Sequence, residues 1–91
     1  MNKSDLINAL KERAGLSRKD SEMVVDTFFG SITESMAAGD RVEIRGFGSF
    51  SVKRYKAYTG RNPKTGTQIY VPAKKLPFFK VGKELKEKVD L

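Results

Sequence analysis

Between Arg45 and Lys83 the chain carries ten Lys or Arg residues and not one Asp or Glu. Within that stretch, the alternation of apolar residues that marks a half-buried strand thins out from Lys53 to Lys75. Two strands of about ten residues, at ~3.3 Å each, would form a ribbon roughly 30 Å long with almost nothing to bury. We therefore expect the middle of the chain to protrude from a small body.

The net charge of +7 comes entirely from this basic segment. Residues 1–44 hold six bases and eight acids, and residues 84–91 hold two bases and three acids. A surface kept charged for solubility normally mixes both signs, which the basic segment does not. Because neutralising phosphates releases condensed counterions, a polyanion is the natural partner of such a segment. The charge pattern predicts nucleic-acid binding, and RNA or an acidic protein stays open as an alternative partner.

The chain has 91 residues, of which 38% are hydrophobic, so it makes a single domain whose core would be small for a monomer. Oligomerisation is the expected remedy. No window approaches the ~20 apolar residues of a membrane span, and residues 1–5 lead into an amphipathic pattern instead of the apolar stretch of a signal peptide. The absence of Cys excludes a disulfide framework. These features predict a soluble intracellular protein that does not associate with membranes.

Two amphipathic helices are expected before the basic segment. Asn2 can cap a first helix that ends at Gly15, and Ser17 can cap a second, longer helix that ends at Gly39. The second helix is the more hydrophobic of the two, and its adjacent apolar pairs require cover on two sides. The short connection between the helices predicts an antiparallel helical hairpin.

Beyond residue 40 the apolar period changes to two, which is the period of strands. The alternation on either side of Gly46-Phe47-Gly48 predicts a β-hairpin with Phe47 and Phe50 in the core. Asn62-Pro63-Lys64-Thr65 suits the turn at the end of the ribbon.

The last part of the chain is expected to return to the body. Leu76, Phe78 and Phe79 are predicted to rejoin the core, and a short closing helix is predicted after Gly82. The expected fold class is α+β, with a helical-hairpin base, a three-stranded antiparallel sheet extended into a protruding β-ribbon arm, and a short C-terminal helix.

Catalysis lacks its usual residues in this chain. There is no His to act as a general base, no Cys nucleophile, and no carboxylate in the basic segment to hold a metal. We predict that the protein is not an enzyme, needs no cofactor and has no small-molecule substrate.

Two short motifs around Gly46 indicate other folds only weakly. Arg45-Gly46-Phe47-Gly48 matches the start of the signature of RNA-recognition modules, but the residues that follow miss it, and two helices should not come first. Gly46 and Gly48 also suit a dinucleotide-binding loop, yet Ser51 occupies the place of its third glycine. We interpret the segment as a tight turn between strands.

Three separated motifs, in this order, resemble the bacterial histone-like proteins HU and integration host factor: Arg45 to Phe50, Thr59 to Gly66, and Phe79 to Lys83. The resemblance covers the whole chain. It implies an intertwined dimer with a helical base and two β-ribbon arms that bind double-stranded DNA through the minor groove and bend it. It also implies a cytoplasmic protein of the bacterial nucleoid that condenses and organises the chromosome.

The resemblance assigns roles to individual residues. Pro63 would intercalate between base pairs and kink the duplex, with Arg61 and Asn62 beside it in the minor groove. Tyr55 and Tyr58 stand where many relatives have arginine, and each suits a strand as well as a stacking or backbone contact with DNA. The remaining DNA-binding candidates are Lys53, Arg54, Lys56, Lys64, Lys74 and Lys75 on the arm, and Lys3, Arg18, Lys80, Lys83 and Lys86 on the flank of the body.

Residues 1–52 and 76–91 would form the dimerisation body, and residues 53–75 the DNA-binding arm. The dimer core is expected to contain Phe28, Phe29, Phe47, Phe50 and Phe79. A homodimer is favoured, and the alternative within the family is one subunit of a sequence-preferring integration host factor heterodimer. An RNA-binding module is the alternative from a different class.

Overall fold

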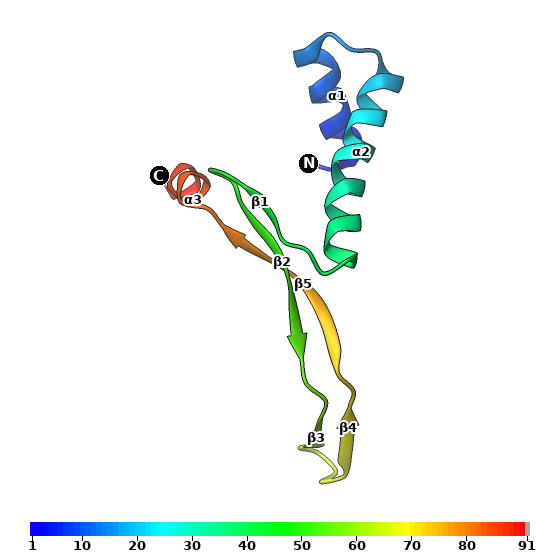
Figure 1. Cartoon of the computed structure of the whole chain (residues 1–91), viewed down its shortest axis with the longest axis vertical. Coiled ribbons are helices and arrows are strands. Elements are labelled where there is room, and N and C mark those ends of the chain that lie inside the picture. The colour runs from blue at the N-terminus through cyan, green and yellow to red at the C-terminus, as the bar shows by residue number, and fades with distance from the viewer. Residues whose placement is uncertain (91) are drawn as a thin grey trace.

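The computed structural model describes residues 1–90 and shows two helices beside a sheet that continues into a long ribbon (Figure 1). The elements are α1 (Lys3–Ala14), α2 (Arg18–Ala37), β1 (Val42–Ile44), β2 (Gly48–Tyr55), β3 (Tyr58–Arg61), β4 (Gln68–Val71), β5 (Lys74–Val81) and α3 (Lys83–Val89). The radius of gyration is 19.0 Å, whereas a compact chain of this length would have about 12 Å. The single chain is therefore highly extended.

The predicted helical hairpin is confirmed. The side chain of Asn2 accepts a hydrogen bond from the N–H of Asp5, and the Asp5 carboxylate accepts one from the N–H of Asn2, which caps the first turn of α1. α1 ends at Gly15, whose φ of 65° is the left-handed conformation common after helices. Ser17 caps α2, which ends at Ala37, two residues before the predicted boundary.

The three-stranded sheet has the order β1-β2-β5, with all pairs antiparallel. The turn between β1 and β2 holds the short C-terminal helix in place. The N–H of Gly82 donates to the carbonyl of Phe47 at 2.9 Å, and the N–H of Leu85 donates to the carbonyl of Gly46 at 3.1 Å. The predicted hairpin, the antiparallel sheet and the closing helix are all confirmed.

The ribbon is interrupted halfway along its length, where a continuous pair of strands was expected. The β2–β5 ladder ends at the pair Tyr55 and Lys74, and the two-stranded sheet β3–β4 starts at the pair Tyr58 and Val71. Pro72 lies in the gap and has no N–H to donate to a ladder. Two residues separate the paired segments on each strand, so the register continues unchanged towards the tip.

The single chain encloses almost no core. Among residues 1–90, the buried apolar side chains are Ile7 and Val25. The ring of Phe79 lies 4.9 Å from that of Phe50 and 5.6 Å from that of Phe47, measured between centroids, but this cluster is open on one side. Four of the six aromatic residues of the body are exposed by 40% or more: Phe28 by 50%, Phe29 by 47%, Phe47 by 45% and Phe79 by 40%. That these residues form a dimer core stays a prediction.

None of the helices formed by residues 1–90 combines the length and the apolar character needed to cross a bilayer.

Candidate nucleic-acid interface

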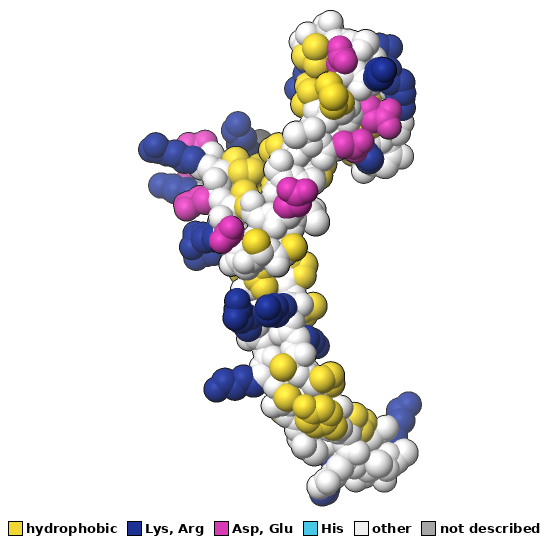
Figure 2. Space-filling model, turned by 45° about the vertical axis from the view of Figure 1, so that its right-hand side comes forward, with side chains coloured by type: hydrophobic (Ala, Val, Ile, Leu, Met, Phe, Trp, Pro, Cys, Tyr) yellow, Lys and Arg dark blue, Asp and Glu magenta, His cyan; other side chains and the backbone are white. Residues whose placement is uncertain are grey.

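The arm, residues 53–75, carries seven cations and no acid. Figure 2 shows Lys and Arg side chains along the ribbon, whereas Asp and Glu gather over the helices and the upper end of the sheet. Every ion pair found within residues 1–90 lies outside the arm: Lys3 with Asp26, Arg41 with Glu43, and Lys83 with Glu87. The positive charge of the arm is therefore not neutralised by these pairs, and phosphates can neutralise it.

The register divides the cations of the arm between two faces of the ribbon. Successive residues of a strand point to opposite faces, and residues paired across strands share a face. One face continues the side of the sheet that bears Phe50 and Phe79, and we call it the Phe50 face. It carries Arg54 and Lys75 in the ladder, and the alternation along the strand assigns Lys56, in the unpaired gap, to the same face. The opposite face, which we call the Lys53 face, carries Lys53, Lys74 and Arg61.

The tip is a tight turn closed by backbone hydrogen bonds. The N–H of Asn62 donates to the carbonyl of Thr67, and the N–H of Gly66 donates to the carbonyl of Asn62, both at 2.8 Å. The side-chain oxygen of Asn62 also accepts from the N–H of Lys64 at 2.9 Å, so this residue shapes the turn as well as lying at the tip. Pro63 is exposed at the end of the arm. The predicted turn is confirmed, and the predicted intercalation by Pro63 stays a prediction.

Two ammonium groups of the arm lie against aromatic rings. The Nζ of Lys53 is 3.6 Å from the ring centroid of Phe78, and the Nζ of Lys74 is 5.8 Å from that of Tyr55. Such contacts between a cation and a ring are attractive and favour particular positions of the flexible lysine side chains. Tyr55 and Tyr58 are both exposed, but they lie on opposite faces of the ribbon.

Leu76, Phe78 and Phe79 return the chain to the sheet of the body as expected, but they do not lie on one face of it, and their burial in a core stays a prediction. Phe79 pairs with Phe50, whereas Leu76 pairs with Lys53 on the opposite face, where Phe78 also lies. In the single chain Leu76 is 43% exposed, Phe78 38% and Phe79 40%, so exposure does not separate them. The signal was present in the sequence, because adjacent residues of a strand cannot point to the same side.

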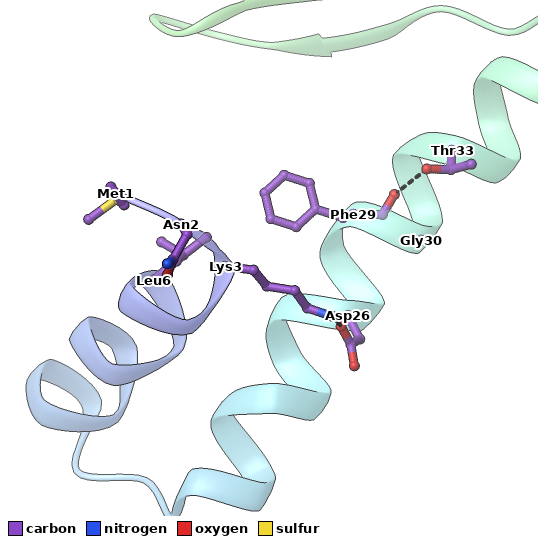
Figure 3. Close-up of a pocket in the computed structure, with 8 residues that line it drawn as sticks. All are labelled: Met1, Asn2, Lys3, Leu6, Asp26, Phe29, Gly30 and Thr33. Carbon is purple, nitrogen blue, oxygen red and sulfur yellow. Dashed lines mark hydrogen bonds and ion pairs between the residues drawn. The ribbon is translucent and has the colours of Figure 1, made fainter.

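The predicted cations on the flank of the body are all exposed, but several already have protein partners. The Nζ of Lys3 lies 2.6 Å from the carboxylate of Asp26, beside a hollow lined by Leu6 and Phe29 (Figure 3). The hydrogen bond to Asp26 raises the pKa of Lys3 above its ordinary value of 10.5. Arg18 donates to the side-chain oxygen of Asn8 at 2.6 Å and so links α2 to α1. A phosphate that binds Lys3 or Arg18 must therefore compete with these protein partners. On the arm no ion pair within residues 1–90 opposes phosphate binding.

The flank cations at the other end of the body lie on and beside α3. Lys83 is 3.9 Å from Glu87, and Lys80 and Lys86 form no ion pair with the described residues. Within residues 1–90, no three His, Cys, Asp or Glu side chains come together in a way that could hold a metal ion.

Comparison with known proteins gives consistent matches over the whole chain. The family described as bacterial DNA-binding protein matches residues 1–90. The DNA-binding protein HU of Geobacillus stearothermophilus is 52% identical over 89 residues, which cover 98% of this chain and 99% of the relative. Among solved structures, an Anabaena HU–DNA cocrystal structure has a TM-score of 0.86 at 40% identity and covers 98% of this chain and 97% of the other. The structure of HU from Thermotoga maritima has a TM-score of 0.68 at 37% identity and covers 98% of each chain.

Proposed function

This chain belongs to the bacterial DNA-binding protein family, and we propose that it is a histone-like architectural protein that binds double-stranded DNA with little sequence preference, bends it and organises the chromosome. It is not an enzyme. The observation that carries the proposal is the arm, where seven cations and no acid lie on a protruding ribbon. A relative solved together with DNA has the same fold over 98% of this chain.

The division of cations between two faces suits a ribbon that lies in a groove. Phosphates border the minor groove on both sides, and the long Lys and Arg side chains of either face can extend to them from the edges of the ribbon. Contacts of this kind fix the position of the protein on the duplex but do not read its sequence. We therefore propose that the arm cations, with Lys80 and Lys86 on the body, bind phosphates, while Pro63 enters a base step from the exposed tip.

Dimers are typical of this family, and we propose that this chain forms a homodimer that acts on the bacterial nucleoid. The exposed rings around Phe47 and Phe79 support this, because one chain leaves them uncovered. The alternative is a heterodimer with a related chain. Measuring the mass of the protein expressed alone distinguishes the two, since a heterodimer subunit would not give a stable dimer by itself.

A competition experiment tests DNA as the partner. Straight duplex, nicked duplex and structured RNA compete for the protein at one fixed salt concentration. Because a nick makes the duplex easier to bend, the nicked duplex should bind most tightly and the RNA least tightly. A preference for RNA would contradict the proposed function and support the RNA-binding module instead.

A further inference from the structure

The Lys53 face of the ribbon carries aromatic rings at regular intervals. The register is unchanged from the pair Gly48 and Val81 to the pair Arg61 and Gln68, so one alternation of faces applies along the whole arm. Phe78, Tyr55 and Tyr70 all fall on this face, at the levels of residues 51, 55 and 59 of the first strand. The rings are therefore spaced four residues apart, or ~13 Å along the strand.

Cations lie between and beside these rings. In order from the body to the tip, the Lys53 face presents Lys80, Phe78, Lys53, Tyr55 with Lys74, Tyr70 and Arg61. The rings are exposed to a large degree: 38% for Phe78, 44% for Tyr55 and 69% for Tyr70. Both contacts between an ammonium group and a ring that are found in residues 1–90 lie on this face. The ammonium group of Lys53, 3.6 Å from the ring centroid of Phe78, lies over the face on which a flat group would stack, so a stacked base would take its place.

Alternating exposed rings and cations are the arrangement that single-stranded nucleic acids recognise. Every base has an aromatic face, but in a duplex these faces are covered by neighbouring base pairs. Only an unpaired base can stack on a protein ring, while neighbouring cations hold the backbone. The Lys53 ammonium would leave the Phe78 ring for a phosphate when a base stacks there, and such a movement needs only side-chain rotation.

We propose that the Lys53 face is a binding site for single-stranded polynucleotides, which stack separate unpaired bases on its three rings and place phosphates against its cations. This goes beyond binding of the duplex, which needs the cations but offers no base faces. The site shares its four cations, Lys53, Arg61, Lys74 and Lys80, with the proposed duplex interface, so duplex and single strand compete for the arm. The Phe50 face offers no equivalent site near the body, because its rings pack against each other there.

Tyrosine fluorescence provides a direct test. The chain contains three Tyr residues and no Trp, and Tyr55, Tyr58 and Tyr70 all lie on the arm. One variant, Tyr55→Phe with Tyr58→Phe, keeps only Tyr70 on the Lys53 face. The matched control, Tyr55→Phe with Tyr70→Phe, keeps only Tyr58 on the opposite face. Both double variants keep an aromatic ring at all three positions. A difference in fluorescence quenching between them therefore reports which face the strand binds and not a change in packing.

The probe is a thymine oligonucleotide of about 16 nucleotides, a length that single-strand binding sites cover, beside a uracil ribo-oligonucleotide and an abasic strand of equal length. The thymine or uracil strand should quench Tyr70 strongly and Tyr58 weakly, and the abasic strand should quench neither. Quenching by either strand with bases supports the proposal, and the stronger one shows which of the two strands is preferred. Equal quenching of Tyr58 and Tyr70, or equal affinity for the abasic strand, would overturn it.

A second variant gives the effect on affinity. Phe78→Leu keeps an apolar side chain but removes one stacking surface, so affinity for the thymine strand should fall about 5- to 100-fold. Affinity for a duplex of equal length should change less than about 2-fold, because the phosphate contacts remain. Equal losses for both ligands, or no loss for the single strand, would overturn the inference. Intact duplex binding in that case would leave the proposed function standing.

Discussion

The glycine at position 48 allows β2 to approach β5 closely. A Cβ added at Gly48 would lie 2.5 Å from the carbonyl oxygen of Lys80 and 2.6 Å from ring atoms of Phe79. The carbonyl belongs to a paired strand and cannot move away easily. Gly48→Ala should therefore lower the free energy of unfolding by about 1–3 kcal/mol, as overpacking does. Denaturant titration measures this, and Gly60→Ala is the control, since its Cβ would meet only the Tyr58 ring at 3.4 Å. Equal stability of Gly48→Ala and the natural protein would contradict the prediction.

The lysines of the two faces should contribute to duplex binding by charge alone. Lys53 and Lys75 are exposed on opposite faces and neither is paired with an acid of residues 1–90. Replacing either by Ala should weaken binding to unrelated duplexes about equally. It should also reduce the slope of log affinity against log salt by ~0.9 for each phosphate that the variant no longer neutralises. Titrations of two unrelated duplexes at several salt concentrations measure both quantities. A variant that changed the preference at one base pair would show that base edges are read directly.

At the scale of elements, local sequence signals were sufficient to predict where helices and strands begin and end, because caps and alternation act on the backbone nearby. Asn2 and Gly15 mark the two ends of α1, and the alternation around Phe50 marks β2. Two features were missed. Pro72 interrupts the ladder because it lies within the paired region, which only the pairing of the strands reveals. Phe78 and Phe79 lie on opposite faces of the sheet, which the alternation along a single strand already indicates. The division of the cations between two faces follows from the same register, which the sequence does not contain explicitly.

The tip of the arm is the element whose role in bending can be separated from binding. Pro63 fixes the backbone at the start of a turn that Asn62 and Gly66 close by hydrogen bonds, so the turn should survive without it. If the ring enters a base step, Pro63→Ala should reduce DNA bending more than affinity for straight duplex. Energy transfer between dyes at the two DNA ends measures bending beside a binding titration. A well-folded variant that bends DNA fully would show that Pro63 only shapes the turn.

At the scale of the whole molecule, the single chain has the shape of one half of an assembly. It spans 59 Å in its longest direction, yet buries only Ile7 and Val25 among the apolar residues of 1–90. Each Å² of apolar surface that stays in water fails to contribute the ~25 cal/mol of stabilisation that burial would give. With so small a core, the single chain cannot compensate for the conformational entropy that is lost on folding. The aromatic residues exposed on α2 and around Phe79 are the surface that a partner would cover. Folding and dimerisation are therefore expected to be one process.

Coupled folding makes stability depend on protein concentration. The denaturant midpoint should rise as the protein concentration is increased from micromolar values, because association draws the equilibrium towards the folded dimer.

Phe47 is the residue to test, since its ring contacts Phe79 but is 45% exposed in the single chain. If a partner completes its burial, Phe47→Ala should lower the free energy of unfolding by ~3–5 kcal/mol. If Phe47 stays half exposed, the loss should be much smaller and independent of concentration. A folded monomer at micromolar concentration, with a midpoint that does not change on dilution, would contradict the coupling of folding to dimerisation.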